Sequence, residues 1–118
     1  DTNTPLIDKK IEGDFKCGDG PILTYGPAVH NKLLDIIIDA AEEKKISFQR
    51  DAASRATGTD TDAFAYSNGG VPSALISFPM RYMHTTVEMV ALTDVEDTVK
   101  LIFETLKKLT PETNFKYL

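Results

Sequence analysis

The sequence predicts an α/β fold, in which helices pack on a central sheet. Short apolar segments bounded by glycine and proline alternate with longer segments whose apolar residues recur at helical spacing. Residues 71–78 form an almost wholly apolar run, which is typical of a strand buried on both faces of such a sheet. The expected order is strand, helix, strand, helix, strand, strand, helix, and this alternation is characteristic of the α/β class.

In the first half of the chain, a polar, turn-rich segment over residues 1–20 precedes a predicted strand at residues 22–25. A helix is predicted over residues 28–44, because its apolar residues fall on one side at helical spacing. They are Leu33, Leu34, Ile37, Ile38 and Ala41. A second short strand is expected at residues 46–49.

Residues 54–61 are rich in small and hydroxyl side chains and are predicted to form a loop. Asp60 or Thr61 can cap a short helix that continues to about Ser67, because both residue types favour the N-cap position. The sequence Asn68-Gly69-Gly70 is expected to end this helix, since these residues adopt the left-handed conformation most easily.

The last third of the chain contains the apolar strand at residues 71–78, a loop over residues 79–86 and a further strand at residues 87–92. Thr93, with Glu96 three residues later, predicts a capping box at the start of a final helix. Its core face is expected to comprise Val95, Val99, Ile102, Phe103 and Leu106.

Composition narrows the functional classes. The 118 residues carry 13 basic and 18 acidic side chains, a net charge of −5, with a pI of about 4.9. This balance argues against nucleic acid and anionic membranes as partners. Cys17 is the sole cysteine, which excludes an internal disulfide and is compatible with a reducing compartment. No apolar run approaches the roughly 20 residues that a membrane helix requires.

Three groups of residues could carry chemistry. His84 follows the buried strand and has Glu88 four residues later, so it is a candidate metal ligand, although a lone histidine is more often structural. His30, near a helix start, is expected to be exposed to solvent or to act as a local cap. Asp60 and Asp62 lie in the loop after the second strand, where they could contact a ligand or merely favour a helix N-terminus.

The segment GTDTDAFAYSNGGVPSALISFPMRYMHTTVEMV resembles the closing part of the glutamyl-aminopeptidase and tetrahedral-aminopeptidase family, some of whose members are labelled endoglucanases. The shared motifs are Gly58-Thr59-Asp60, Gly70-Val71-Pro72 and Arg81-Tyr82-Met83-His84 followed by a polar pair and Glu88. The resemblance implies a central mixed sheet flanked by helices. That sheet belongs to the C-terminal part of an aminopeptidase-type, phosphorylase/hydrolase-like catalytic domain.

The resemblance also implies a function. Enzymes of this family are cytoplasmic, form homo-oligomers of up to twelve subunits, and remove N-terminal residues from peptides with two divalent ions, often zinc or cobalt. By this resemblance His84 is a metal ligand, and Thr59, Asp60 and Arg81 lie around the substrate pocket. Glu88 or a backbone carbonyl is expected to orient the second ring nitrogen of His84.

The remaining metal ligands, the general base and an inserted small β-domain of the family lie upstream of the segment that residues 1–118 resemble. We therefore expect residues 1–118 to be the C-terminal portion of the catalytic domain, with no catalytic residue of its own and no activity alone. One alternative is a non-catalytic α/β fragment with an interaction or assembly role. A second is a glycoside hydrolase, which needs two carboxylates flanking a sugar bond.

Overall fold

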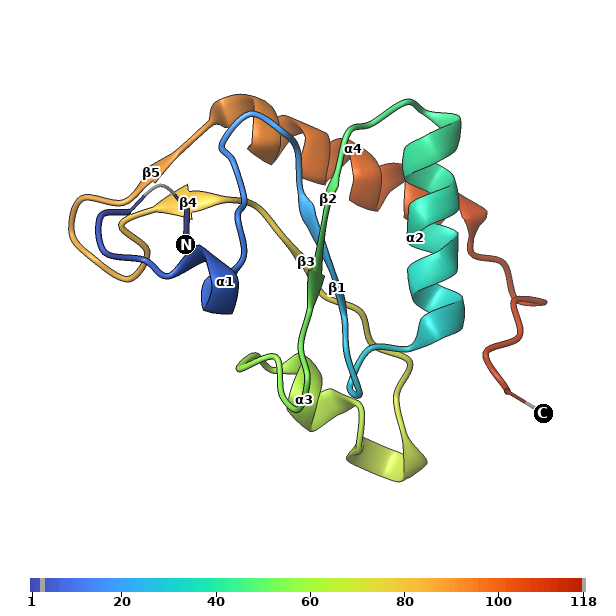
Figure 1. The fold of residues 1–118 in the computed structure, drawn as a ribbon. Helices are drawn as coiled ribbons and strands as arrows, with labels where there is room; N and C mark the ends of the chain where they lie inside the picture. Colours follow the sequence, from blue (N-terminus) through green and yellow to red (C-terminus); the bar gives the residue numbers. More distant parts are fainter. Residues whose placement is uncertain (3, 118) are drawn as a thin grey trace.

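The computed structural model describes residues 1–2 and 4–117. Its elements, in chain order, are α1 (Lys9–Glu12), β1 (Ile22–Tyr25), α2 (Asn31–Glu43), β2 (Gln49–Ala52), α3 (Thr61–Phe64), the 3₁₀ helix η1 (Ser67–Gly69), β3 (Ile76–Ser77), β4 (Met80–Arg81), β5 (Met89–Val90) and α4 (Leu92–Lys108). Figure 1 shows α2 and α4 beside a small sheet formed by β1, β2 and β3. The predicted mixed α/β class is confirmed.

The main sheet has the strand order β2-β1-β3. Strand β1 pairs with β2 in parallel, with Ile22 opposite Gln49, and pairs with β3 antiparallel, with Ile22 opposite Ser77. The last residues of β1 and β2 therefore lie at one end of the sheet, and the last residue of β3 lies at the other. This register determines where the loops that follow the strands are placed.

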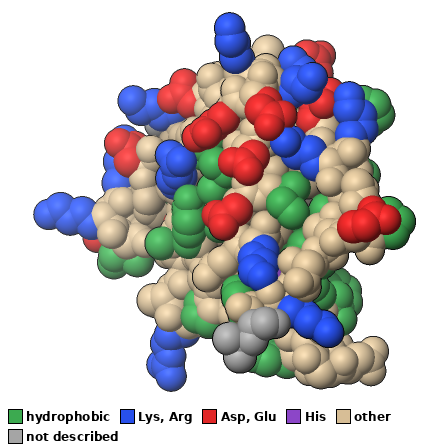
Figure 2. All heavy atoms as spheres, turned by 90° about the vertical axis from the view of Figure 1, so that its right-hand side faces the viewer, with side chains coloured by type: hydrophobic (Ala, Val, Ile, Leu, Met, Phe, Trp, Pro, Cys, Tyr) green, Lys and Arg blue, Asp and Glu red, His purple; other side chains and the backbone are tan. Residues whose placement is uncertain are grey.

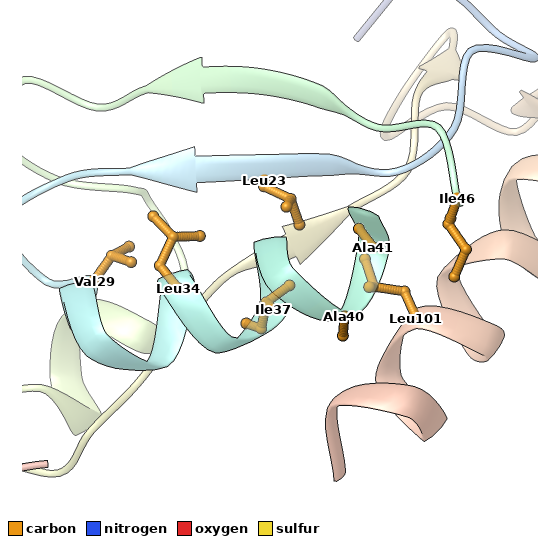
Figure 3. Packing of buried hydrophobic residues seen from close by; sticks show 8 residues of the cluster. All are labelled: Leu23, Val29, Leu34, Ile37, Ala40, Ala41, Ile46 and Leu101. Atoms are coloured by element: carbon orange, nitrogen blue, oxygen red, sulfur yellow. The ribbon is translucent and has the colours of Figure 1, made fainter. Parts of the chain in front are cut away.

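The core lies between β1 and α2 (Figure 3). Leu23 of β1 is fully buried and points toward α2, whose Leu34 and Ile37 are also buried. The predicted apolar stripe of this helix is thus confirmed, although the helix begins at Asn31 rather than at residue 28. Residues 26–29 form a turn instead, in which the Val29 N–H donates to the carbonyl of Gly26 at 3.0 Å. Burying one such side chain contributes about 1.5–3 kcal/mol.

The second strand was predicted at residues 46–49, and this prediction is wrong by about three residues. Strand β2 spans Gln49–Ala52, and its side chains alternate between half-buried and exposed. Ile46 is buried, but it lies in the connection between α2 and β2, where it closes the end of the core. The apolar side chain that suggested a strand is therefore a core residue of a turn.

The prediction that residues 71–78 form a strand buried on both faces is also wrong for this chain. Only Ile76–Ser77 is a strand, both of its residues are half-buried, and Val71 and Phe78 are 43% and 36% exposed. Strand β3 pairs with β1 on one side, and its other pairing edge has no strand partner among the described residues. An edge strand keeps part of its surface in solvent, as here.

Residues 79–86 were predicted to form a loop, but Met80–Arg81 forms β4 and pairs antiparallel with β5. The strand predicted at residues 87–92 shortens to Met89–Val90, because α4 begins at Leu92. The loop that bears His84 is therefore the connection of a two-stranded hairpin, separate from the main sheet.

Helix α4 differs from its prediction in two respects. Ala91 occupies the N-cap position and makes no side-chain capping bond, so the capping box of Thr93 and Glu96 is not formed. The buried face of the helix comprises Asp94, Thr98, Leu101 and Thr105. Val95 is half-buried. The other predicted core residues Val99, Ile102, Phe103 and Leu106 are 43–62% exposed.

Helices α2 and α4 pack against each other and are joined by ion pairs near their C-terminal ends. Lys108 pairs with Glu43 at 2.7 Å, and Lys44 pairs with Glu104 at 3.7 Å. On the face seen in Figure 2, acidic and basic side chains are interspersed, as expected for a solvated surface. Within the described part of the chain, no helix is long and apolar enough to cross a membrane.

Candidate functional site

His84 lies in the connection between β4 and β5, which we call the His84 loop (residues 82–88). Register places Met80 opposite Val90 and Arg81 opposite Met89, so the hairpin closes directly below this loop. The side chain of His84 is exposed, and its backbone N–H donates to Oε1 of Glu88 at 2.6 Å. Glu88 or a backbone carbonyl is the expected partner of the second ring nitrogen of His84, and in this structure the Glu88 carboxylate binds the backbone N–H of His84.

Arg81 precedes the His84 loop and is half-buried. Its guanidinium carbon lies 4.7 Å from the centre of the Tyr82 ring, a distance that allows a cation–π interaction. In the described part of the chain, its buried Nε atom has no hydrogen-bond partner. Because this Nε atom is buried, any contact of Arg81 with a ligand would have to come from its other guanidinium nitrogens.

Thr59 and Asp60 lie in a second loop, which we call the Thr59 loop (residues 54–61). Both side chains are exposed. The loop is organised by the neighbouring Asp62, whose carboxylate accepts from the N–H groups of Thr57 and Gly58 at 3.0 and 2.9 Å, and from the Thr57 hydroxyl at 2.9 Å. The bond from the Thr57 N–H is the main cause that lowers the pKa of Asp62 below its ordinary value of 3.8.

Asp60 occupies the N-cap position of α3, but its side chain makes no capping hydrogen bond. The helix ends at Phe64, and η1 follows after two residues, so the helix expected through Ser67 is interrupted. Asn68, Gly69 and Gly70 have positive φ values of 49°, 79° and 103°, which confirms the predicted left-handed termination.

The two loops lie at opposite ends of the main sheet. The Thr59 loop follows β2, whose last residue Ala52 lies opposite Tyr25 at the end of β1. The His84 loop follows β3 and β4, and the last residue of β3 lies opposite Ile22 at the start of β1. Figure 1 shows the same separation, with α3 at the bottom and β4 and β5 at the upper left. Thus Arg81 and His84 are neighbours, whereas Thr59 and Asp60 are remote from them within one chain.

His30 was expected to be exposed or to act as a local cap, but it is half-buried and its side chain makes no capping hydrogen bond. It precedes α2 and stacks on Tyr117 with ring centres 4.6 Å apart, and its ring meets Phe115 edge-on at 5.6 Å. These contacts anchor the C-terminal segment beside a cleft of about 600 Å³. The partners of His30 lie more than 80 residues further along the chain, so local sequence patterns could not reveal them.

The residues described here do not by themselves fit a pair of metal ions. Residues 1–2 and 4–117 contain no group of three or more His, Cys, Asp and Glu side chains arranged around a possible ion. Glu88, the carboxylate nearest to His84 in the sequence, is engaged by the His84 backbone. A zinc-type site requires at least three protein ligands, and His84 can supply one of them.

This fold is similar to that of solved aminopeptidases. Aminopeptidase APDkam598 from the archaeon Desulfurococcus kamchatkensis is 31% identical, with a TM-score of 0.80, over 93% of this chain and 32% of its own. PhTET1-12s, whose structure is described as a dodecamer, is 29% identical, with a TM-score of 0.63, over 92% of this chain and 32% of its own.

The likeness extends to sequence. Lysyl aminopeptidase of Pyrococcus furiosus is 36% identical over 94 residues, which are 80% of this chain and 27% of that protein. The family model of M42 glutamyl aminopeptidase matches residues 2–101. The chain therefore belongs to the M42 glutamyl aminopeptidase family, which confirms the resemblance seen in its motifs. It spans about a third or less of the length of these relatives.

Proposed function

We propose that residues 1–118 are the C-terminal portion of the catalytic domain of an aminopeptidase that uses two divalent metal ions, zinc or cobalt. The complete protein would remove N-terminal residues from peptides, and His84 would supply one metal ligand. The observation that carries the proposal is the placement of His84. It is exposed, and it lies in a loop closed by a hairpin and fixed by a hydrogen bond from its own backbone to Glu88.

Arg81 supports the same assignment, because it ends β4 three residues before His84 and is half-buried beside the His84 loop. We propose that Arg81 contacts the peptide substrate close to the metal centre. Thr59 and Asp60 are proposed as further substrate contacts on the basis of family resemblance. They lie at the other end of the sheet. They would therefore contact either the substrate of a neighbouring subunit or a distant part of an elongated peptide bound to their own subunit.

The proposal also covers the oligomeric state of the complete protein, its location in the cell and the activity of the isolated chain. A similar structure is described as a dodecamer, and we propose that the complete protein is also a homo-oligomer. A cytoplasmic location is proposed from the single exposed Cys17, which is compatible with a reducing environment. The isolated chain is proposed to be inactive, because a peptidase of this type needs a general base and bridging carboxylates in addition to one histidine.

The test replaces His84 in the full-length polypeptide and measures bound metal and hydrolysis of aminoacyl-p-nitroanilides. His84→Ala is expected to lower bound zinc or cobalt and to reduce kcat/KM by at least about 100-fold, since altering even the groups behind a metal ligand costs 10–100-fold. His30→Ala is the matched control, because it removes an imidazole that stacks on Tyr117 and is far from the His84 loop in sequence and fold. It should retain both metals.

Retention of both metals at wild-type affinity in His84→Ala would contradict the ligand assignment. The rival proposal, a non-catalytic α/β fragment with an assembly role, predicts that the purified protein has the mass of 118 residues and binds no metal pair. The peptidase proposal predicts a subunit about three times longer, because this chain covers 27–32% of its relatives.

A further inference from the structure

The backbone of the His84 loop has an unfavourable conformation at two of its first three residues. Tyr82 has a φ of 57° and His84 has a φ of 65°, both in the left-handed region. In this region the Cβ atom of an L-residue approaches the following carbonyl oxygen, so non-glycine residues adopt it uncommonly, and asparagine, aspartate and histidine do so more often than the others. The conformation is therefore more unfavourable at Tyr82 than at His84. Such a conformation persists only where surrounding interactions hold it in place.

Two side-chain oxygens provide those interactions. The N–H of Tyr82 donates to Oγ1 of Thr4 at 3.0 Å, and the N–H of His84 donates to Oε1 of Glu88 at 2.6 Å. Each of the two left-handed residues is thus bound through its amide to a side-chain oxygen, Tyr82 to one from the N-terminal segment and His84 to one at the end of the same loop. A third bond, from the Thr85 hydroxyl to the Tyr82 carbonyl at 2.6 Å, closes the turn from inside.

Both oxygens are themselves held in place. The Thr4 hydroxyl donates to Oδ1 of Asp1 at 2.5 Å, and the neighbouring Thr2 N–H donates to the Met80 carbonyl at 2.7 Å. Contacts between residues 2 and 80, and between residues 4 and 82, show that the N-terminal segment runs alongside β4 in the same direction. Glu88 directly precedes β5, whose pairing with β4 fixes its position.

We propose that Thr4 and Glu88 are positioning residues for His84. They hold Tyr82 and His84 in the left-handed conformation and so determine the direction in which the imidazole leaves the hairpin. Thr4 is the less obvious of the two, because 80 residues separate it from His84 in the sequence. The consequence for metal binding rests on the proposed function, whereas the effect on the backbone of the loop does not.

The experiment compares two pairs of variants in the full-length polypeptide. Thr4→Val removes the accepting oxygen and keeps the side-chain shape, and Thr4→Ser keeps the oxygen. Glu88→Met removes the acceptor with little change in length, and Glu88→Gln keeps an amide oxygen that can accept the same bond. Hydrogen exchange at the amides of Tyr82 and His84 reports on the loop, and a titration with Zn²⁺ alone reports on the imidazole.

In Thr4→Val and Glu88→Met, amide exchange of the residue that loses its acceptor is expected to accelerate about tenfold, the factor expected for one lost hydrogen bond. The Ser and Gln variants should stay within about twofold of the wild type. Zn²⁺ affinity should fall about 10–100-fold in the first two variants and recover in the conservative ones, as for other groups that orient a ligand. The positioning role would be overturned by unchanged amide exchange in Thr4→Val and Glu88→Met, or by equal acceleration in all four variants.

The two readouts separate this inference from the proposed function. If amide exchange accelerates and Zn²⁺ binding is unaltered, Thr4 and Glu88 position the loop, and the assignment of His84 as a metal ligand fails. Loss of Zn²⁺ binding without accelerated exchange would keep His84 as a ligand and overturn the role of Thr4 and Glu88. Far-UV circular dichroism identifies any variant that loses its fold, and such a variant is replaced in the comparison by Glu88→Leu or Thr4→Ala.

Discussion

Asp94 is the buried group whose removal should affect this fold most clearly. It lies in the first turn of α4 with no exposed surface. Its carboxylate accepts from the N–H of Gly18 at 2.7 Å and from the N–H of Gly20 at 2.9 Å. These bonds join α4 to the loop before β1 across 74–76 residues of sequence. The substitution Asp94→Ala removes both acceptors and leaves the donors behind.

The two donors differ in their exposure to solvent, and this determines how much stability is lost with each hydrogen bond. Gly20 is buried, so its unpaired N–H would cost about 1–3 kcal/mol, whereas the N–H of exposed Gly18 can bind water. Loss of a negative charge at the start of α4 adds about 0.3–1 kcal/mol. Release of the carboxylate from burial opposes these costs in part. The expected loss for Asp94→Ala is therefore about 1–3 kcal/mol. Asp94→Asn keeps one acceptor and should lose about half as much.

Urea unfolding of the 118-residue chain, followed by circular dichroism, measures this loss. With a slope of about 2 kcal/mol per molar urea, the midpoint should fall by about 0.5–1.5 M in Asp94→Ala and by about half that in Asp94→Asn. A shift below about 0.3 M in the alanine variant would refute the reasoning, because it would mean that the two bonds contribute almost nothing beyond what water supplies.

Three further predictions concern the core, one turn and the dependence on pH. Leu101→Ala should lower the unfolding free energy by about 2–5 kcal/mol in urea denaturation, whereas Phe103→Ala on the same helix should cost less than about 1 kcal/mol, because Leu101 has 0% and Phe103 58% of its surface exposed. Gly20→Ala should cost more than about 2 kcal/mol in the same assay, because φ is +90° there and a Cβ atom would lie 2.0 Å from the Ser47 carbonyl oxygen. The folded pKa of Asp62 is lowered, so its contribution to stability is complete above the ordinary value of 3.8 and is lost as pH falls through the folded value. A carboxyl titration by NMR with a midpoint at or above 3.8 would contradict this.

Local patterns predicted the elements whose partners are close in sequence. The stripe of α2 includes Leu34 and Ile37 and packs on β1, which immediately precedes it, so helical spacing was sufficient. The same reasoning misplaced β2, because buried Ile46 belongs to a turn and its apolar side chain carries no information about backbone pairing. Buried apolar residues often belong to strands, but a residue such as Ile46 can be buried at the end of a core without being part of a strand.

The site was predictable as a set of residues but not as an arrangement. The motif around Arg81 and His84 is continuous in sequence, and the structure keeps these residues adjacent on β4 and its loop. Whether Thr59 lies near them depends on the direction of β3 relative to β1, which is antiparallel. An apolar run has the same composition in either direction, so no pattern within residues 71–78 could decide this.

Helix α4 shows most clearly what periodicity leaves open. The face predicted to be buried remains largely exposed, including Ile102, Phe103 and Leu106. A different face, which includes Asp94, Thr98 and Leu101, is the one that is buried. Two features favour burial of this face: Asp94 binds the N–H groups of Gly18 and Gly20, and Leu101 packs in the hydrophobic core. In this orientation Phe103 and its apolar neighbours remain exposed to water. The helix therefore has two faces that could be buried, and in the described chain only the more polar one is. A helix with this pattern is expected where both sides meet protein, and this agrees with the proposal that the chain is one portion of a larger catalytic domain.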